Sequence, residues 1–184
     1  SWLIDITNIV MLETGQPLHA FDANGIKSIT VSYAKNNQKV TLLNEKEYDL
    51  NDTIPLIKVN DTIAAVAGVM GADAHSVTEN TTAIVLESAI FEPTIVRKGA
   101  QQLGLRSESS ARFEKGVDAT GVSAAVNRVH ELLSDNQSEM QINAPAESGT
   151  IVKKHYQIPF NLDQMNNFLG TEFSLNQVSD RLSP

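Results

Sequence analysis

The spacing of apolar residues changes near residue 90, and this change limits the folds open to the chain. Between residues 28 and 90, short apolar segments alternate with turn residues, which is typical of β-structure. Beyond residue 90, apolar residues recur at helical spacing. We therefore predict a mixed α/β fold with a layered, sandwich-like β-sheet core, flanking helices and a short helical C-terminal tail.

Turn and cap residues set the expected boundaries of these elements. The predicted strands span residues 29–33, 40–43, 48–50, 55–59, 62–66, 83–90 and 151–159. The predicted helices span residues 5–15 (with a strand as the alternative), 94–103 after Pro93, 118–134, 161–169 and 175–182. We expect Asp5 or Thr7 to cap the first helix and Gly15 to end it. We expect 16–22 to be irregular and Asn36-Asn37 to close a hairpin between 29–33 and 40–43.

Composition narrows the function classes. The 184 residues are 41% hydrophobic, so a sizeable core is possible, and the net charge of −8 disfavours binding to a long nucleic-acid backbone. One basic island, residues 97–115, holds five basic and two acidic residues, which allows a small contact with an anion. The chain has no cysteine, and its four histidines are scattered, so we predict no metal site. No apolar run is long enough to cross a membrane, and we expect a cytoplasmic protein.

Residues 103–118 form the most polar constellation of the sequence. Serine, glutamate and arginine alternate there too quickly for an apolar face to form. The segment either lies on the surface or lines a polar cavity, and its surroundings favour the cavity. The hydroxyl groups of Ser107, Ser109 and Ser110 have a second interpretation, because serine is also a common helix N-cap.

Glu87 lies inside the apolar run 84–90. Burying a carboxylate costs several kcal/mol unless it is paired, so Glu87 either faces water on an edge strand or stands at the wall of a pocket. His19 is either a structural hydrogen-bond donor or part of a site. Gly68 and Gly71 either end a strand or let a ligand approach the backbone.

Five segments together carry a family resemblance: residues 5–8, 15–22, 67–71, 86–89 and 105–118. In this order and spacing, across residues 3–135, they resemble the beta subunit of bacterial phenylalanyl-tRNA synthetase. The resemblance implies that residues 1–149 are its central editing, tRNA-binding domain and that 150–184 begin the following helical domain. Since the chain starts without methionine and stops abruptly, we expect a segment of a longer protein.

The implied activity is hydrolysis of tyrosine wrongly esterified to tRNA(Phe), within the enzyme that ligates phenylalanine to tRNA(Phe). A hydrophobic pocket rejects an added hydroxyl only about 100-fold, which explains why a second, hydroxyl-binding site is needed. The resemblance implies partners in the 3′ end of tRNA(Phe) and the alpha subunit. It implies no cofactor for this segment, and ATP and Mg²⁺ only for the aminoacylation reaction of the parent enzyme.

The resemblance also assigns residues. The implied catalytic residues are His19, Glu87 and Ser107. The implied substrate-binding residues are Thr7, Asn8, Gly71 and Ser109. Contact with tRNA phosphates is expected from Arg97, Arg106 and Arg112, although pairing with Glu108 and Glu114 is an alternative role for these cations.

Three positions depart from the family pattern, which commonly has Thr where this chain has Ser107, Ala where it has Ser109 and Gly where it has Ala72. They motivate a second hypothesis, a non-catalytic scaffold or RNA-binding module with a degenerate pocket. A freestanding deacylase is a third.

Overall fold

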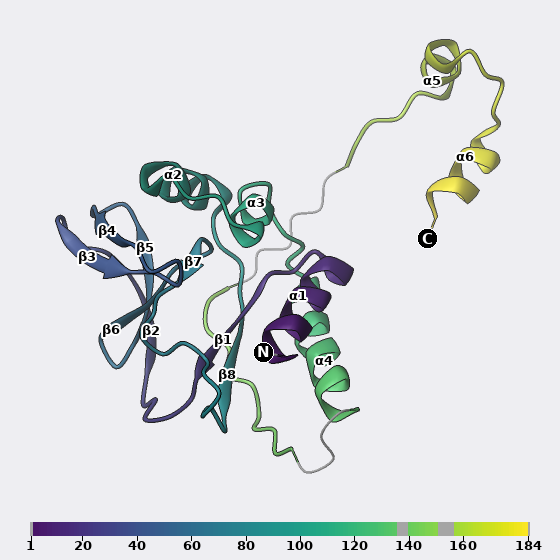
Figure 1. The fold of residues 1–184 in the computed structure, drawn as a ribbon. Coiled ribbons are helices and arrows are strands. Elements are labelled where there is room, and N and C mark those ends of the chain that lie inside the picture. Colours follow the sequence, from purple (N-terminus) through teal and green to yellow (C-terminus); the bar gives the residue numbers. More distant parts are fainter. Residues whose placement is uncertain (1, 136–139, 151–156, 184) are drawn as a thin grey trace. The chain divides into compact units, whose positions relative to one another are not determined.

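The structure is a computed structural model that describes residues 2–135, 140–150 and 157–183 (Figure 1). The chain divides into two compact units, Ser1–Glu147 and Ser148–Pro184. The first unit contains α1 (Trp2–Thr14), β1 (Leu18–Asp22), β2 (Ile29–Tyr33), β3 (Gln38–Thr41), β4 (Glu47–Leu50), β5 (Pro55–Val59), β6 (Thr62–Val66), β7 (Met70–Gly71), β8 (Ile84–Ser88), α2 (Pro93–Leu103), α3 (Glu108–Phe113) and α4 (Gly121–Ser134). The second contains α5 (Leu162–Leu169) and α6 (Leu175–Leu182). The predicted mixed α/β class is confirmed.

The strands of the first unit form antiparallel sheets in the orders β1-β8, β2-β5-β6-β7 and β3-β4. The turn at Asn60 and Asp61 joins β5 to β6, and both residues have positive φ, as tight hairpins require. The predicted hairpin between 29–33 and 40–43 is wrong, because β2 pairs with β5 while β3 pairs with β4. Asn37 does turn the chain, with φ of 62°. The Asn36-Asn37 motif thus predicted the turn correctly, but it did not indicate which strands pair on either side of it.

The two-stranded sheet β1-β8 has apolar partners on both faces. Successive side chains of a strand point to opposite faces. On one face, Leu18 and Leu86 pack against a cluster formed by α1 and α4, which lie side by side (Figure 1). On the other face, Phe21 is buried in a second cluster with Ile57 of β5 and Ala65 of β6. His19 and Glu87 share this second face, so the fold turns both toward the four-stranded sheet.

The N-terminal helix differs from its prediction at its start. It begins at Trp2, so Asp5 and Thr7 lie inside it and neither is its cap. It ends as predicted before Gly15, whose φ is 76° and whose amide donates to the carbonyl of Met11. The expected irregular segment 16–22 is wrong, because Leu18–Asp22 form β1. Their hydrogen-bond partners lie in β8, far along the chain, which no local pattern reveals.

The segment after β8 follows its prediction, whereas β8 itself does not. β8 covers Ile84–Ser88 rather than the predicted 83–90; its five residues are half-buried, and among the described residues β1 is its neighbouring strand. Helix α2 has Pro93 at its start and Gly104 in the left-handed conformation after its end, as predicted. Helix α4 begins at Gly121 rather than at 118, because the Asp118 carboxylate accepts from the amide and hydroxyl of Thr120.

In the second unit the predicted helix–turn–helix outline is confirmed. Asn161 and Ser174 cap the starts of α5 and α6, and Gly170 ends α5 in the left-handed conformation. Residues 151–156 of the predicted strand 151–159 lie outside the described residues, and 157–159 have no regular secondary structure. Among the helices that the structure describes, none combines the length and the apolar character needed to span a bilayer.

Candidate functional site

His19 and Glu87 are direct partners across the antiparallel pair of β1 and β8. Side chains at directly opposed positions have Cβ atoms about 5 Å apart and share one face of the sheet. Leu18 and Leu86, on the other face, are held against the helices α1 and α4. That packing fixes which way the strands face, and so aims the imidazole and the carboxyl group into the same space.

Gly71 in β7 lies against His19. A Cβ atom on Gly71 would stand 2.6 Å from Cε1 and 2.8 Å from Nε2 of His19, and 2.9 Å from Cδ1 of Leu43. Gly71 does not have a positive φ, so the backbone alone does not require glycine here. The requirement is steric, because any side chain at this position would displace the imidazole.

A cavity of about 70 Å³ lies between β1-β8, the turn after β6 and α3. Four of the predicted site residues line it: His19, Gly71, Glu87 and Ser109. Its volume is roughly half of the ~150 Å³ engineered cavity that admits benzene in another protein. An aromatic ring is therefore taken in completely only if part of the wall moves. The flexible, half-buried side chain of Met70 belongs to that wall.

Burial shifts the two titratable groups of the cavity toward their neutral forms. It raises the pKa of Glu87 from its ordinary value of 4.5 to about 7. It lowers the pKa of His19 below its ordinary value of 6.5. Near neutral pH the imidazole is therefore uncharged, and the carboxyl group exchanges between its protonated and ionised forms. Such a pair can accept hydrogen bonds from a small polar ligand and can also donate hydrogen bonds to it.

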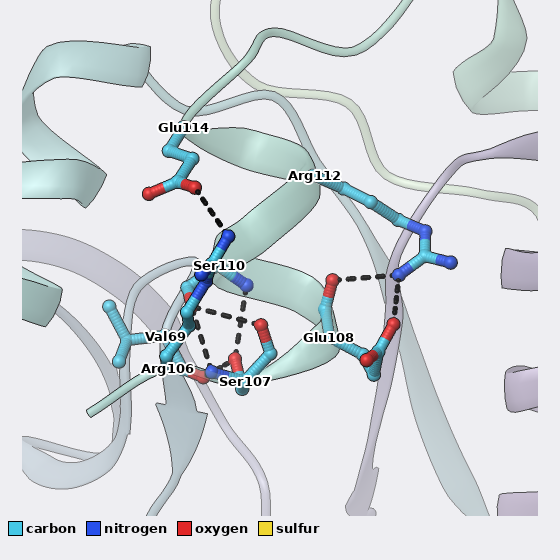
Figure 2. Close-up of polar contacts among 7 residues, drawn as sticks. All are labelled: Val69, Arg106, Ser107, Glu108, Ser110, Arg112 and Glu114. Carbon is cyan, nitrogen blue, oxygen red and sulfur yellow. Dashed lines mark hydrogen bonds and ion pairs between the residues drawn. The ribbon is translucent and has the colours of Figure 1, made fainter.

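Ser107 is the N-cap of α3 and makes internal hydrogen bonds (Figure 2). Its Oγ accepts from the amide of Ser110 (3.0 Å) and donates to the carbonyl of Val69 (2.6 Å), while the Ser110 hydroxyl accepts from the amide of Ser107 (2.9 Å). The two bonds between Ser107 and Ser110 form a capping box, and the bond to Val69 ties α3 to the turn that carries the cavity wall. Ser107 itself does not line the cavity.

Thr7 and Asn8 lie on α1, and neither is among the residues that line the cavity. Thr7 is buried, and its hydroxyl donates to the carbonyl of Ile4 within the same helix (2.9 Å). Asn8 is exposed. The structure thus does not bring these two predicted substrate-binding residues together with His19 and Glu87.

Two of the three predicted tRNA-binding arginines form ion pairs (Figure 2). The Arg112 guanidinium donates to the Glu108 carboxylate (2.7 Å), and Arg106 approaches Glu114 at 3.5 Å. These are the intramolecular pairs that the sequence offered as an alternative. Arg97 is exposed on α2 and takes part in none of the ion pairs found among the described residues.

Most of the cavity wall was not predicted from the sequence. The residues missed are apolar and come from β1 and the residue before it, from β5, β6, the turn after β6, β7 and α3: Pro17, Leu18, Ile57, Ala65, Val66, Val69, Met70 and Phe113. Gly68, which the sequence singled out together with Gly71, also lines the cavity. A Cβ atom on Gly68 would stand 2.9 Å from the Val96 side chain, and its φ is 70°, so both space and backbone favour glycine.

The comparisons with known proteins all point to one family. The family model of the B3/4 domain matches residues 1–138. The chain is 40% identical to the phenylalanine–tRNA ligase beta subunit of Halalkalibacterium halodurans, over 98% of the chain and 23% of that protein. It is 40% identical to the corresponding subunit of Shouchella clausii, over 96% and 22%, and 37% identical to that of Acinetobacter baylyi, over 100% and 23%.

The chain thus spans just under a quarter of the length of the curated relatives it matches. The matching segment includes every residue that lines the cavity, since all of them lie before position 138. The chain belongs to the B3/4 domain family, and its relatives are phenylalanine–tRNA ligase beta subunits.

Proposed function

We propose that this chain is the editing module of a phenylalanine–tRNA ligase and hydrolyses tyrosine misattached to tRNA(Phe). The observation that carries the proposal is the position of Glu87 opposite His19 on the wall of a cavity. A carboxyl group in a wall built mainly from apolar residues is costly unless a ligand hydrogen-bonds to it. The phenolic hydroxyl of tyrosine supplies that bond, and phenylalanine does not.

In this proposal Glu87 recognises the hydroxyl in either protonation state. The ionised carboxylate accepts the phenolic O–H, and the protonated acid donates to the phenolic oxygen. With phenylalanine bound, the carboxyl group has no partner, which costs about 1–3 kcal/mol. Before this selection acts, the ring must widen the cavity, and we assign that movement to Met70.

The hydrolysis itself needs a positioned water more than a nucleophile, because an aminoacyl ester is already activated. The water oxygen attacks the ester carbonyl carbon, the bond from that carbon to the ribose oxygen breaks, and the ribose oxygen takes up the proton that the water loses. The uncharged imidazole of His19 can accept a hydrogen bond from the attacking water and orient it. Gly71 keeps the space that the imidazole occupies. Ser107 acts from outside the cavity, by holding the turn at Val69.

For Thr7, Asn8 and Ser109 we keep the substrate-binding role as part of the proposal. Ser109 lines the cavity, so its hydroxyl is within the volume that the ring would enter. Thr7 and Asn8 would have to act on a part of the substrate that extends beyond the cavity. The basic residues Arg97, Arg106 and Arg112 would meet the phosphates near the 3′ end of tRNA(Phe).

The wider context is also proposed. By similarity to the beta subunits, the parent enzyme ligates phenylalanine to tRNA(Phe) in the cytoplasm together with an alpha subunit. ATP and Mg²⁺ would serve a synthetic site outside this chain.

Two observations favour a second function, a non-catalytic scaffold or RNA-binding module. The cavity is small, and the Ser107 hydroxyl is engaged in internal hydrogen bonds. A deacylation assay separates the two functions. Tyrosyl-tRNA(Phe) is added to the intact ligase that contains this segment, and tyrosine release is followed with time. Release well above the uncatalysed rate supports editing, and release at the uncatalysed rate supports the scaffold.

A further inference from the structure

Gln16 is a buried polar residue between the end of α1 and the start of β1, and the proposed reaction does not use it. Only 2% of its surface is exposed. Its backbone is fixed from the helix side, because its amide donates to the hydroxyl of Thr14 (3.2 Å), which in turn donates to the carbonyl of Val10 (2.7 Å). The side chain therefore projects from a firmly held position.

The carboxamide of Gln16 links the two strands that carry His19 and Glu87. Its Nε2 donates to the carbonyl of Ala89 (2.8 Å) and to the carbonyl of Pro17 (3.1 Å). Pro17 directly precedes β1, and Ala89 directly follows β8. The first pair of the ladder is Leu18 with Ser88, and the next is His19 with Glu87. The link thus closes the end of the ladder nearest to the site.

The other half of the carboxamide indicates what the residue is for. Its Oε1 is buried, and no donor among the described residues reaches it. An unpaired buried acceptor costs about 1–3 kcal/mol. A methionine would fill nearly the same volume without this cost. Packing therefore does not explain a carboxamide here, whereas the two bonds donated by Nε2 do.

We propose that Gln16 is a positioning residue of the deacylation site, whose Nε2 clamps the end of β8 to the start of β1 and so keeps Glu87 opposite His19. Gln16 does not touch the substrate. The inference rests on the proposed function, since it matters for selection between tyrosine and phenylalanine only if that selection occurs here.

The first test replaces the carboxamide by an apolar side chain of the same length. In the intact ligase, Gln16→Met should lower the kcat/KM ratio of tyrosyl- over phenylalanyl-tRNA(Phe) by about tenfold, as expected for one misplaced hydrogen bond, with the phenylalanyl rate changed less than about twofold. The matched control is Gln38→Met on β3, whose side chain serves a turn remote from the cavity. An unchanged ratio in Gln16→Met would overturn the inference.

Gln16→Glu distinguishes the contribution of Nε2 from that of Oε1. When ionised, the new carboxylate keeps an acceptor and loses both donated bonds. When protonated, its O–H can donate to Ala89 again. The ratio should therefore recover toward the wild-type value as the pH falls, and should remain low at every pH in Gln16→Met. Because His19 and Glu87 titrate in the same range, each variant is compared with the wild type at the same pH. A ratio equal to wild type while the carboxylate is ionised would assign the role to Oε1 and contradict the proposal.

Hydrogen exchange of the 184-residue chain provides a readout that does not depend on activity. Gln16→Met should speed exchange of the β1–β8 ladder amides and leave the β2–β5 ladder unchanged; equal exchange in the β1–β8 ladder would contradict the clamp. A wild-type ligase that does not release tyrosine contradicts the proposed function. A wild-type ligase that selects tyrosine, with Gln16→Met equally selective, contradicts the Gln16 inference alone.

Discussion

His19 and Glu87 stand directly opposite each other on neighbouring strands, and burial shifts their pKa values in opposite directions. Both shifts favour the uncharged group. The site thus holds a neutral base and a weak acid on a shared face, and among the described residues these two form no ion pair with each other. Their consequences for stability and for selection can be measured separately.

Glu87 should make the chain less stable as the pH rises. A carboxyl group whose folded-state pKa is raised stabilises the folded state fully below 4.5 and loses that contribution as the pH rises through about 7. The difference amounts to up to about 3 kcal/mol. Glu87→Gln removes this dependence, so the variant should gain stability relative to wild type between pH 4.5 and pH 8. Urea unfolding at several pH values measures the difference.

His19 acts in the opposite sense, because its lowered pKa costs stability as the pH falls below 6.5. Both proteins contain His19, so its effect largely cancels in the comparison. Parallel curves for wild type and Glu87→Gln would show that Glu87 titrates as an exposed carboxyl group.

Gly71→Ala should damage the site through contact with His19. The new Cβ would lie 2.6 Å from the imidazole, so either the ring or β7 must move. We expect a loss of stability of about 1–3 kcal/mol together with a loss of deacylation. The matched control is Gly99→Ala in α2, where a Cβ meets nothing within 4 Å and helix propensity predicts a gain of up to about 1 kcal/mol. Equal effects of the two substitutions would contradict the steric explanation.

Ser107→Ala should destabilise the first unit by about 1–3 kcal/mol, because it removes a helix cap and the bond to Val69. Ser107→Thr keeps the hydroxyl and should recover most of that stability. Ser109→Ala is the control for stability, since the side chain of Ser109 makes no hydrogen bond within the part of the chain that the structure describes. Thermal unfolding ranks the three variants by stability. A Ser107→Ala protein as stable as Ser109→Ala would contradict the role of Ser107 in holding the turn at Val69.

Arg97 should contribute to tRNA binding more than its paired neighbours. Arg97→Ala should weaken binding of tRNA(Phe) a few-fold and lower the slope of log affinity against log salt by about 0.7–0.9, the value for one phosphate contact. Lys39→Ala is the control, because Lys39 lies on the β3-β4 sheet, outside the basic island, and is paired with Glu47. Titrations at several salt concentrations measure both, and an unchanged slope for Arg97→Ala would exclude a phosphate contact there.

The elements that were predicted correctly have local signals. The Pro93 start and Gly104 end of α2 are adjacent to the helix they delimit. In contrast, β1 was missed, and the partner of β2 was assigned wrongly, because these pairings join residues that are far apart in the sequence. Local patterns carry little information about such contacts.

The residues of the site also divide into those with a signal in the sequence and those without one. His19, Glu87, Gly71 and Ser109 were singled out from motifs, and the structure brings them to one cavity. The apolar wall, including Met70, has the same composition as any core and so carries no separate signal. Gln16 was also not predicted, because its proposed role depends on a bond to Ala89, which directly follows β8 and lies far along the chain.

The most direct measurement of the central claim compares two esters and two proteins. The kcat/KM for hydrolysis of tyrosyl- and phenylalanyl-tRNA(Phe) is determined for the intact ligase and for its Glu87→Ala variant. If Glu87 binds the phenolic hydroxyl, the wild type favours the tyrosyl ester, and the variant loses about 5- to 150-fold of that preference while its phenylalanyl rate stays nearly constant. A variant that keeps the full preference would contradict the account.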